Sequence, residues 1–270
     1  MKSAVTIALV PQIKSGPWVF WENIEDSFTK AASLGFDAVE LFTASATAVD
    51  VTLLHQLSES YRIRICAVGT GAGKVVQGLT LTDPDADVRA HAVKFISEMI
   101  DFGATFNAPA IIGSMQGNIP QTTERTIALQ WLSEGISILA GKAEKKGVHL
   151  IYEPLNRYET NIFNCFADAI AWLEMLGTNN IKLLADLFHM NIEEVSIPET
   201  ICQYSSYIGH VHFADSNRRA MGMGHTAMND IAKALQSISY DGYISAEVFP
   251  WPNSDAAARQ TINAFNTWFK

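Results

Sequence analysis

Four side chains that can bind a metal ion stand at the carboxyl ends of short apolar runs. They are Glu153, Asp186, His212 and Glu247. The first of them is followed by Pro154, and a proline holds its preceding residue in an extended conformation and donates no ladder hydrogen bond. The apolar runs are therefore typical of buried strands that each end in a polar residue. Three carboxylates and one imidazole on successive strand ends predict a site for a divalent cation.

The types of these four residues narrow the choice of metal. Three carboxylates are too rich in oxygen for a structural zinc site. Mn²⁺, Mg²⁺ and Co²⁺ suit carboxylate and imidazole ligands with open positions for substrate oxygens. Any one of the four could instead form an ion pair with a lysine or arginine. Ion pairs do not readily explain why all four residues stand at the ends of apolar runs.

A cation in such a site would support proton transfer next to a carbonyl group. When it binds adjacent carbonyl and hydroxyl oxygens, it acidifies the neighbouring C–H and stabilises the enediolate left behind. Glu153 and Glu247, on roughly opposite sides of a ring of strands, could each reach one face of that carbon. Removal of the proton by one and its return by the other is epimerisation. Delivery to the neighbouring carbon is aldose–ketose isomerisation, and residue types alone do not choose between the two.

The spacing of the four residues predicts the scaffold. They follow one another at intervals of 33, 26 and 35 residues, and one strand with its helix and loops takes roughly 30 residues. The predicted strands are 4–10, 36–42, 64–68, 109–112, 148–152, 182–185, 208–211 and 243–246. The predicted helices are 22–34, 49–61, 87–106, 121–146, 166–176, a short one after Pro198, 229–238 and 255–269.

Eight strands that alternate with helices predict a parallel α/β fold, a (β/α)8 TIM barrel formed by a single domain over residues 1–270. The alternative is an open doubly wound sheet, which would not place four ligands on four consecutive strands. Segment 72–87 is too long for a simple turn and predicts a functional or lid loop.

Composition and charge exclude several classes of protein. The chain is 48% apolar and 17% charged, with a net charge of −9 and no basic run, which argues against nucleic acid as a partner. Three cysteines without a pairing pattern favour a reduced, cytoplasmic protein. The apolar start, residues 4–10, is better explained as the first strand than as a signal peptide. No apolar stretch reaches the roughly 18 residues of a membrane span.

Several motifs resemble the ketose 3-epimerases, the tagatose and allulose (psicose) 3-epimerase group of the xylose-isomerase-like barrels. The motifs are Glu153-Pro-Leu-Asn-Arg-Tyr-Glu159, Asp186-Leu-Phe-His-Met-Asn-Ile-Glu-Glu194, His210-Val-His-Phe-Ala-Asp-Ser-Asn-Arg-Arg219, Gly222-Met-Gly224 and Ser245-Ala-Glu-Val248. Within that group the chain is most similar to the 5-keto-L-gluconate epimerase branch. The segments Gly69-Thr-Gly71, Ile111-Ile-Gly113, Asn191-Ile-Glu-Glu-Val195 and Ile197-Pro-Glu199 carry this narrower likeness.

The resemblance implies roles for seven residues. The four strand-end residues would bind one divalent metal ion, usually manganese, and the two glutamates among them would also be the acid and the base. Glu159, His189 and Arg218 would contact the substrate oxygens around the reacting carbons. The alternatives are a surface pair of Glu159 with Arg157, a helix-capping His189 and a solvated Arg218. The substrate would be a sugar or keto-sugar acid, and dimers or tetramers of the chain are possible.

Some residues depart from the family pattern, and others have no role that the resemblance implies. Ala220-Met221-Gly222 stands where these families often carry proline before the glycine. A keto-acid substrate would need a cation, for which Lys74 and Arg219 are candidates by type only. His210 is on the same strand face as His212 and is better explained as structural. Glu40 ends the second strand, but the sequence shows no partner for it.

Three other functions compete. An isomerase of the hydroxypyruvate or xylose isomerase type would use the same metal and bases, so only product analysis separates it from an epimerase. An abasic-site endonuclease shares this barrel, but it needs several zinc ions, more histidine ligands and a basic surface. A sugar-binding protein without catalysis would not need two opposed glutamates.

Overall fold

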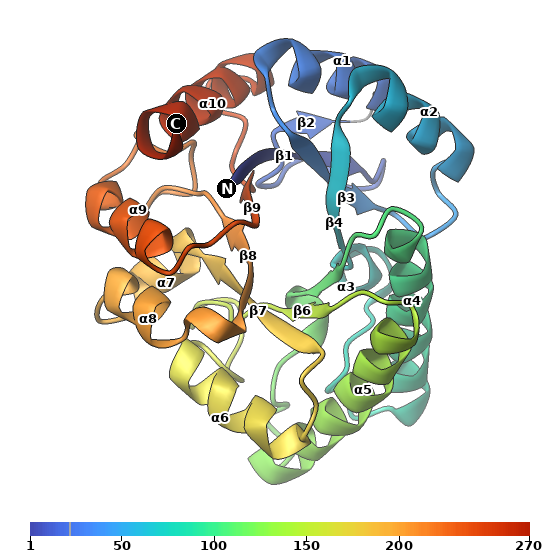
Figure 1. Cartoon of the computed structure of the whole chain (residues 1–270). Coiled ribbons are helices and arrows are strands. Elements are labelled where there is room, and N and C mark those ends of the chain that lie inside the picture. Colours follow the sequence, from blue (N-terminus) through green and yellow to red (C-terminus); the bar gives the residue numbers. More distant parts are fainter. Residues whose placement is uncertain (22) are drawn as a thin grey trace.

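The computed structural model describes residues 1–21 and 23–270, and its strands form a closed parallel barrel surrounded by helices (Figure 1). The first strand of the ring pairs with the last, so the sheet closes on itself. In ring order the strands are β1 (Lys2–Leu9), β3 (Ala38–Thr43), β4 (Arg64–Gly69), β5 (Ala110–Ile112), β6 (Leu150–Tyr152), β7 (Ile181–Asp186), β8 (Ile208–His212) and β9 (Tyr243–Ala246). The eight-stranded α/β barrel predicted from the sequence is confirmed.

One further strand, β2 (Phe20–Trp21), pairs in parallel with Ile7 and Ala8 of β1. The sequence prediction has only an aromatic loop here. The indole nitrogen of Trp21 donates a hydrogen bond to the carbonyl oxygen of Trp18, at 2.8 Å. This short strand therefore attaches the loop that carries Trp18 to the carboxyl-terminal half of β1.

Ten α-helices in the described residues connect or follow the strands. They are α1 (Ile24–Leu34), α2 (Val51–Tyr61), α3 (Ala72–Gln77), α4 (Ala86–Ala104), α5 (Arg125–Lys145), α6 (Phe166–Leu176), α7 (Leu187–Glu193), α8 (Ile197–Gln203), α9 (Met228–Ser237) and α10 (Ser254–Phe269). Gly35 ends α1 with a φ of 83°, in the left-handed conformation that glycine adopts without strain. The predicted start of this helix at residue 22 lies outside the described residues.

Three helical predictions need correction. Helix α5 begins at Arg125 instead of residue 121, because a turn precedes it in which the Thr123 amide donates to the Pro120 carbonyl. Helix α3 lies inside segment 72–87, which the sequence predicts as loop. Helix α7 follows β7 directly and was not predicted. Both are only six or seven residues long, too short for a helical period to show in the sequence.

Side chains alternate between the barrel interior and the surrounding helices along each strand, since successive residues of a strand point to opposite faces. On β6, Ile151 belongs to an interior cluster with Ala67, Ile111 and Leu184. Tyr152 points the other way and packs against Trp172, with ring centroids 5.1 Å apart. The same alternation turns Glu153 back toward the barrel axis.

In the described part of the chain, we find no helix that combines the length and the apolar character needed to cross a membrane.

Candidate metal centre

The four residues predicted as metal ligands come together at the carboxyl-terminal end of the barrel. Asp186 and His212 are the last residues of β7 and β8, and Glu153 and Glu247 directly follow β6 and β9. One donor atom from each lies within 4.8 Å of the others. Three of the four are buried, and Glu247 is partly buried. The predicted convergence of these side chains is thus seen in the structure.

His212 stands at the centre of the group. Its Nδ1 atom lies 3.3 Å from Asp186 Oδ2 and 3.5 Å from both Glu153 Oε1 and Glu247 Oε2. Its other ring nitrogen, Nε2, lies 3.1 Å from Glu40 Oε1. The imidazole therefore faces three carboxylates with one nitrogen and a fourth carboxylate with the other.

Two carboxylate oxygens are oriented as open donors toward the centre of this group. Glu153 Oε1 is buried and has no hydrogen-bond partner, an arrangement that costs free energy unless a cation or donor compensates it. The two carboxylate oxygens of Asp186 have different partners. Oδ1 accepts hydrogen bonds from the amides of Phe188 and His189 at the start of α7, whereas Oδ2 faces His212. These donors fit a divalent cation of the Mn²⁺, Mg²⁺ or Co²⁺ type.

Charges around the group shift the pKa values of its members. Burial raises the pKa of Glu247 to about 7, and the positive charges of Arg218 and His212 oppose this shift. Burial also acts to raise the pKa of Asp186, but His189 and Arg218 outweigh it and hold that pKa well below its ordinary value. In His212, burial lowers the pKa, and the carboxylates of Glu40 and Glu247 more than reverse this.

Arg218 is buried beside the ligands instead of being solvated. Its NH2 group donates to Glu247, and its NH1 group lies 3.5 Å from Asp186 Oδ2 and 3.2 Å from His189 Nε2. The φ of Arg218 is 56°, in the left-handed region that non-glycine residues rarely adopt. The loop after β8 holds it there, because the Arg218 amide donates to the Asp215 carbonyl and the Phe249 amide donates to the Arg218 carbonyl.

His189 belongs to the wall of the site. It lies in α7 and is 2% exposed, with Nε2 3.9 Å from Glu153 Oε1. The backbone amide of Asn156 donates to its Nδ1. Its Nε2 lies 3.2 Å from Arg218 NH1, a nitrogen that can only donate, so the ring is held between Asn156 on one side and Arg218 on the other.

Glu159 is 3.0 Å from the side-chain nitrogen of Asn156. Arg157 pairs with Glu193 instead of Glu159, with an N–O distance of 2.9 Å, so the alternative of a Glu159–Arg157 surface pair is wrong. Asn156, buried and bonded to both His189 and Glu159, was missed because a loop asparagine gives no signal in the sequence.

A cavity of about 190 Å³ opens onto the ligands. The predicted residues Glu159, His189 and Arg218 line it together with the ligands Glu153, His212 and Glu247. Its apolar wall includes Trp18 and Phe42, whose rings stack with centroids 4.2 Å apart. Lys74 and Arg219 are not among the lining residues. Arg219 instead lies over the ring of Trp251, 4.1 Å from its centroid.

Comparisons with known proteins agree with the barrel fold. The sequence model of the xylose isomerase-like TIM barrel family matches residues 28–268. The D-psicose 3-epimerase of Agrobacterium fabrum is 31% identical over 226 residues, which cover 82% of this chain and 77% of that protein. The L-ribulose 3-epimerase of a Methylomonas species is 28% identical over 94% of this chain and 88% of its own length.

Among solved structures, the 3-keto-D-glucoside 4-epimerase of Escherichia coli has a TM-score of 0.83 over 99% of both chains, at 20% identity, which is a likeness of fold. The resemblance to ketose 3-epimerases carried by the sequence motifs is confirmed by these relatives. The narrower likeness to the 5-keto-L-gluconate branch stays a prediction.

Proposed function

We propose an epimerase activity on free ketoses for this chain, which belongs to the xylose isomerase-like TIM barrel family. The reaction would invert the carbon next to the carbonyl group of a sugar. One observation carries the proposal: Glu153 and Glu247 come from strands on different sides of one cavity, yet both carboxylates reach within 3.5 Å of His212 Nδ1. The curated relatives, which are epimerases of D-psicose and L-ribulose, support the same reaction class.

The two glutamates would share the proton transfer. One carboxylate takes the proton from the carbon, and the electrons of the broken C–H bond move into the carbonyl to give an enediolate. The second glutamate then donates a proton to the opposite face of the same carbon, and the electrons return to re-form the C=O bond. No proton or electron is gained overall, so the product differs from the substrate only in configuration.

A divalent cation, when bound by Glu153, Asp186, His212 and Glu247, would acidify the C–H bond next to the carbonyl. We expect manganese, with magnesium and cobalt as alternatives. The Arg218 guanidinium would donate hydrogen bonds to the sugar oxygens, the His189 imidazole would contact the same oxygens, and Glu159 would accept from a hydroxyl group. Trp18 and Phe42 would cover one side of the sugar and exclude water.

The substrate class that we propose is a neutral ketose. Of the two cations considered for a keto-acid carboxylate, neither lines the cavity, and Arg218 is already paired with Glu247. A homo-oligomer (dimer or tetramer) is proposed on the family resemblance alone. A cytoplasmic location is proposed because all three cysteines are unpaired.

Proton NMR in D₂O tests the reaction. The metal-loaded protein is incubated with fructose, tagatose, psicose or 5-keto-gluconate, and deuterium is followed at the carbon beside the carbonyl. A new epimer that carries deuterium is the expected result, with the neutral ketoses ahead of the keto acid. An aldose product would instead identify an aldose–ketose isomerase. A protein that binds metal but exchanges no proton with any of these sugars would refute the two-glutamate scheme for them.

A further inference from the structure

A carboxylate outside the ligand group lies on the floor of the cavity. Glu40 is in β3, it is 4% exposed, and it lines the same cavity as Glu153, His212 and Glu247. Its two oxygens contact two histidines of β8, with Oε1 3.1 Å from His212 Nε2 and Oε2 2.8 Å from His210 Nε2. The contact joins residues 170 or more positions apart in the chain.

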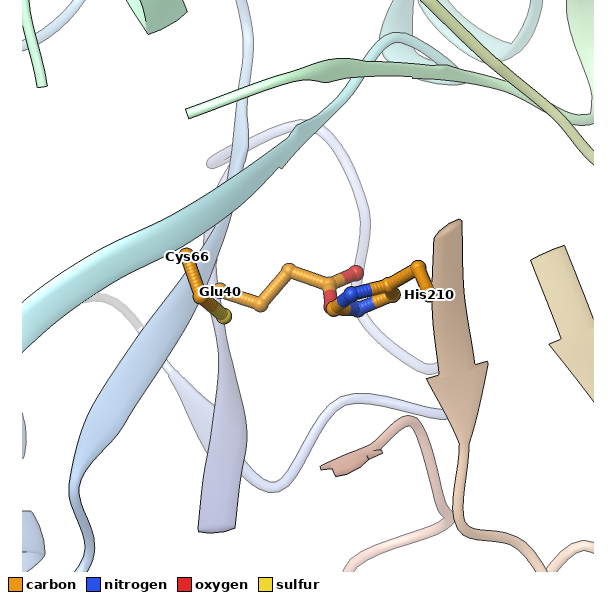
Figure 2. A group of neighbouring side chains, drawn as sticks. All are labelled: Glu40, Cys66 and His210. Carbon is orange, nitrogen blue, oxygen red and sulfur yellow. The ribbon is translucent and has the colours of Figure 1, made fainter. Parts of the chain in front are cut away.

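Figure 2 shows the part of this contact that joins Glu40 to His210. The side chain of Glu40 extends from β3 toward the imidazole of His210 on β8, and Cys66 comes from β4. His210 and His212 both point inward because they are two residues apart on one strand. A single carboxylate can therefore accept from both rings, one with each oxygen.

These contacts fix which nitrogen of His212 carries a proton. An ionised carboxylate only accepts hydrogen bonds, so Nε2 of each ring must donate to Glu40. A metal ion on Nδ1 would take the place of the second ring proton, so the one proton that remains stays on Nε2; Nδ1 is the atom that faces Asp186, Glu153 and Glu247.

We propose that Glu40, anchored by His210, is a positioning residue that holds His212 in the tautomer and ring orientation of a metal ligand. The proposal rests on the metal centre of the proposed function. Partners of this kind typically change metal affinity 10–100-fold when they are removed. His210 has a related but smaller task, because it fixes the second oxygen of Glu40 and so the plane of the carboxylate.

The same three residues could be taken for a second metal site, since Cys66, Glu40 and His210 offer donor atoms within 4.8 Å of one another. The hydrogen bonds argue against it. Both oxygens of Glu40 are already engaged by imidazole nitrogens, and burial raises the pKa of the Cys66 thiol, which disfavours the thiolate that a metal would bind. The experiment below separates the two possibilities.

The substitution Glu40→Gln keeps the size of the side chain and changes its hydrogen bonding. The glutamine amide group donates as well as accepts, so His212 is no longer held to a proton on Nε2. If the proton moves to Nδ1, the metal loses its nitrogen ligand. We expect the affinity for Mn²⁺ or Co²⁺ to fall 10–100-fold, with stoichiometry unchanged at one ion per chain.

Metal affinity is measured on the full chain by competition with a chromophoric chelator. The matched control is Glu194→Gln, since Glu194 also accepts two hydrogen bonds, from the Phe166 amide and the Thr200 hydroxyl, but lies at a helix end away from the ligands. The control should bind metal within about twofold of the unmodified chain, well inside the 10–100-fold range expected for a ligand partner. Cys66→Ser should do the same, and loss of a second bound ion in that variant would establish the three-residue metal site and overturn our assignment.

A measurement on the unmodified chain covers the case in which Glu40→Gln fails to fold. Nitrogen-15 NMR of the histidine rings in the magnesium-loaded protein should show His212 with its proton on Nε2, and a proton on Nδ1 would overturn the proposal. Failures are also distinguishable. If the unmodified chain binds no divalent ion, the proposed function falls; if it binds one ion and Glu40→Gln binds as tightly, only the positioning role falls.

Discussion

Gly113, one residue beyond β5, gives the sharpest test of the site geometry. A Cβ atom added there would lie 2.3 Å from Glu153 Oε2, whereas ordinary contact begins at 3.4 Å. The φ of Gly113 is −101°, outside the left-handed region. Gly113→Ala therefore presses a methyl group against Glu153, whose carboxylate must move by about 1 Å to relieve the contact.

The size of the effect follows from that displacement. A misplacement of about 1 Å in a reacting group can cost about 10²-fold in rate, which corresponds to about 2.7 kcal/mol of transition-state stabilisation. We expect Gly113→Ala to lower kcat/KM for ketose epimerisation by about this factor and to weaken metal binding. Both are measured on the same preparation, by initial rates of epimer formation and by chelator competition.

Gly141 provides the matched control. It lies within α5, and a Cβ atom added there meets no other atom within 4 Å. Gly141→Ala should keep full activity and stabilise the fold by roughly 0.5–1 kcal/mol, as glycine-to-alanine changes inside helices do. If Gly113→Ala retains the activity of the unmodified chain, then Glu153 does not work from the position described above, and the reasoning is refuted.

Three further predictions follow from other contacts. Asn156→Ala should lower kcat/KM about tenfold and leave metal affinity unchanged, because it removes a hydrogen bond to Nδ1 of His189 but contacts no metal ligand. An unchanged kcat/KM would show that Asn156 does not position His189. Chelation of the metal should lower the unfolding temperature, and added Mn²⁺ should restore it, because a ligand of the folded state stabilises it; an unfolding temperature insensitive to chelator would argue against the metal centre.

The third prediction concerns the pKa of Asp215. Burial acts to raise this pKa, but backbone amides that donate to the carboxylate, such as that of Thr226, outweigh burial and lower it below 3.8. A depressed pKa contributes stability above pH 3.8 that is lost as the pH falls through the folded value. The deficit of Asp215→Asn in denaturant unfolding should therefore be largest near neutral pH and shrink in acid, and a constant deficit would contradict it.

The sequence predicted the barrel, and which four side chains come together at its end, because both depend on short-range patterns. An apolar run that ends in Glu153 before proline signals a strand end locally, and alternation along the strand then sets the direction of the side chain. Repetition of the design at Asp186, His212 and Glu247 adds the spacing of a strand and helix unit. Nothing in these inferences requires knowledge of contacts between distant parts of the chain.

The short helices and the loop contacts escaped prediction for the opposite reason. Helix α7 has no apolar period of its own, and its start depends on Asp186, whose side chain caps the helix with one oxygen and faces the site with the other. The sequence pattern identifies Asp186 only as a strand-end residue, so it does not show that the same side chain also caps a helix. Asn156 is similar, because its partner His189 is 33 positions away.

The contacts of Glu40 could not be predicted from the sequence, because they depend on the closure of the barrel. On β3 it is an acidic residue in an apolar strand with no partner in view, and 170 residues separate it from His210. Closure of the ring by β1 and β9 brings β3 close to β8 in space, although the two strands are not neighbours in the sheet. The spacing of two between His210 and His212 places both rings on the inward face of β8, where they share the Glu40 carboxylate. In our proposal, that carboxylate determines which nitrogen of His212 faces the metal. The contact of Glu40 with His212 therefore depends on two features of the fold: the alternation of side chains along β8 and the closure of the barrel.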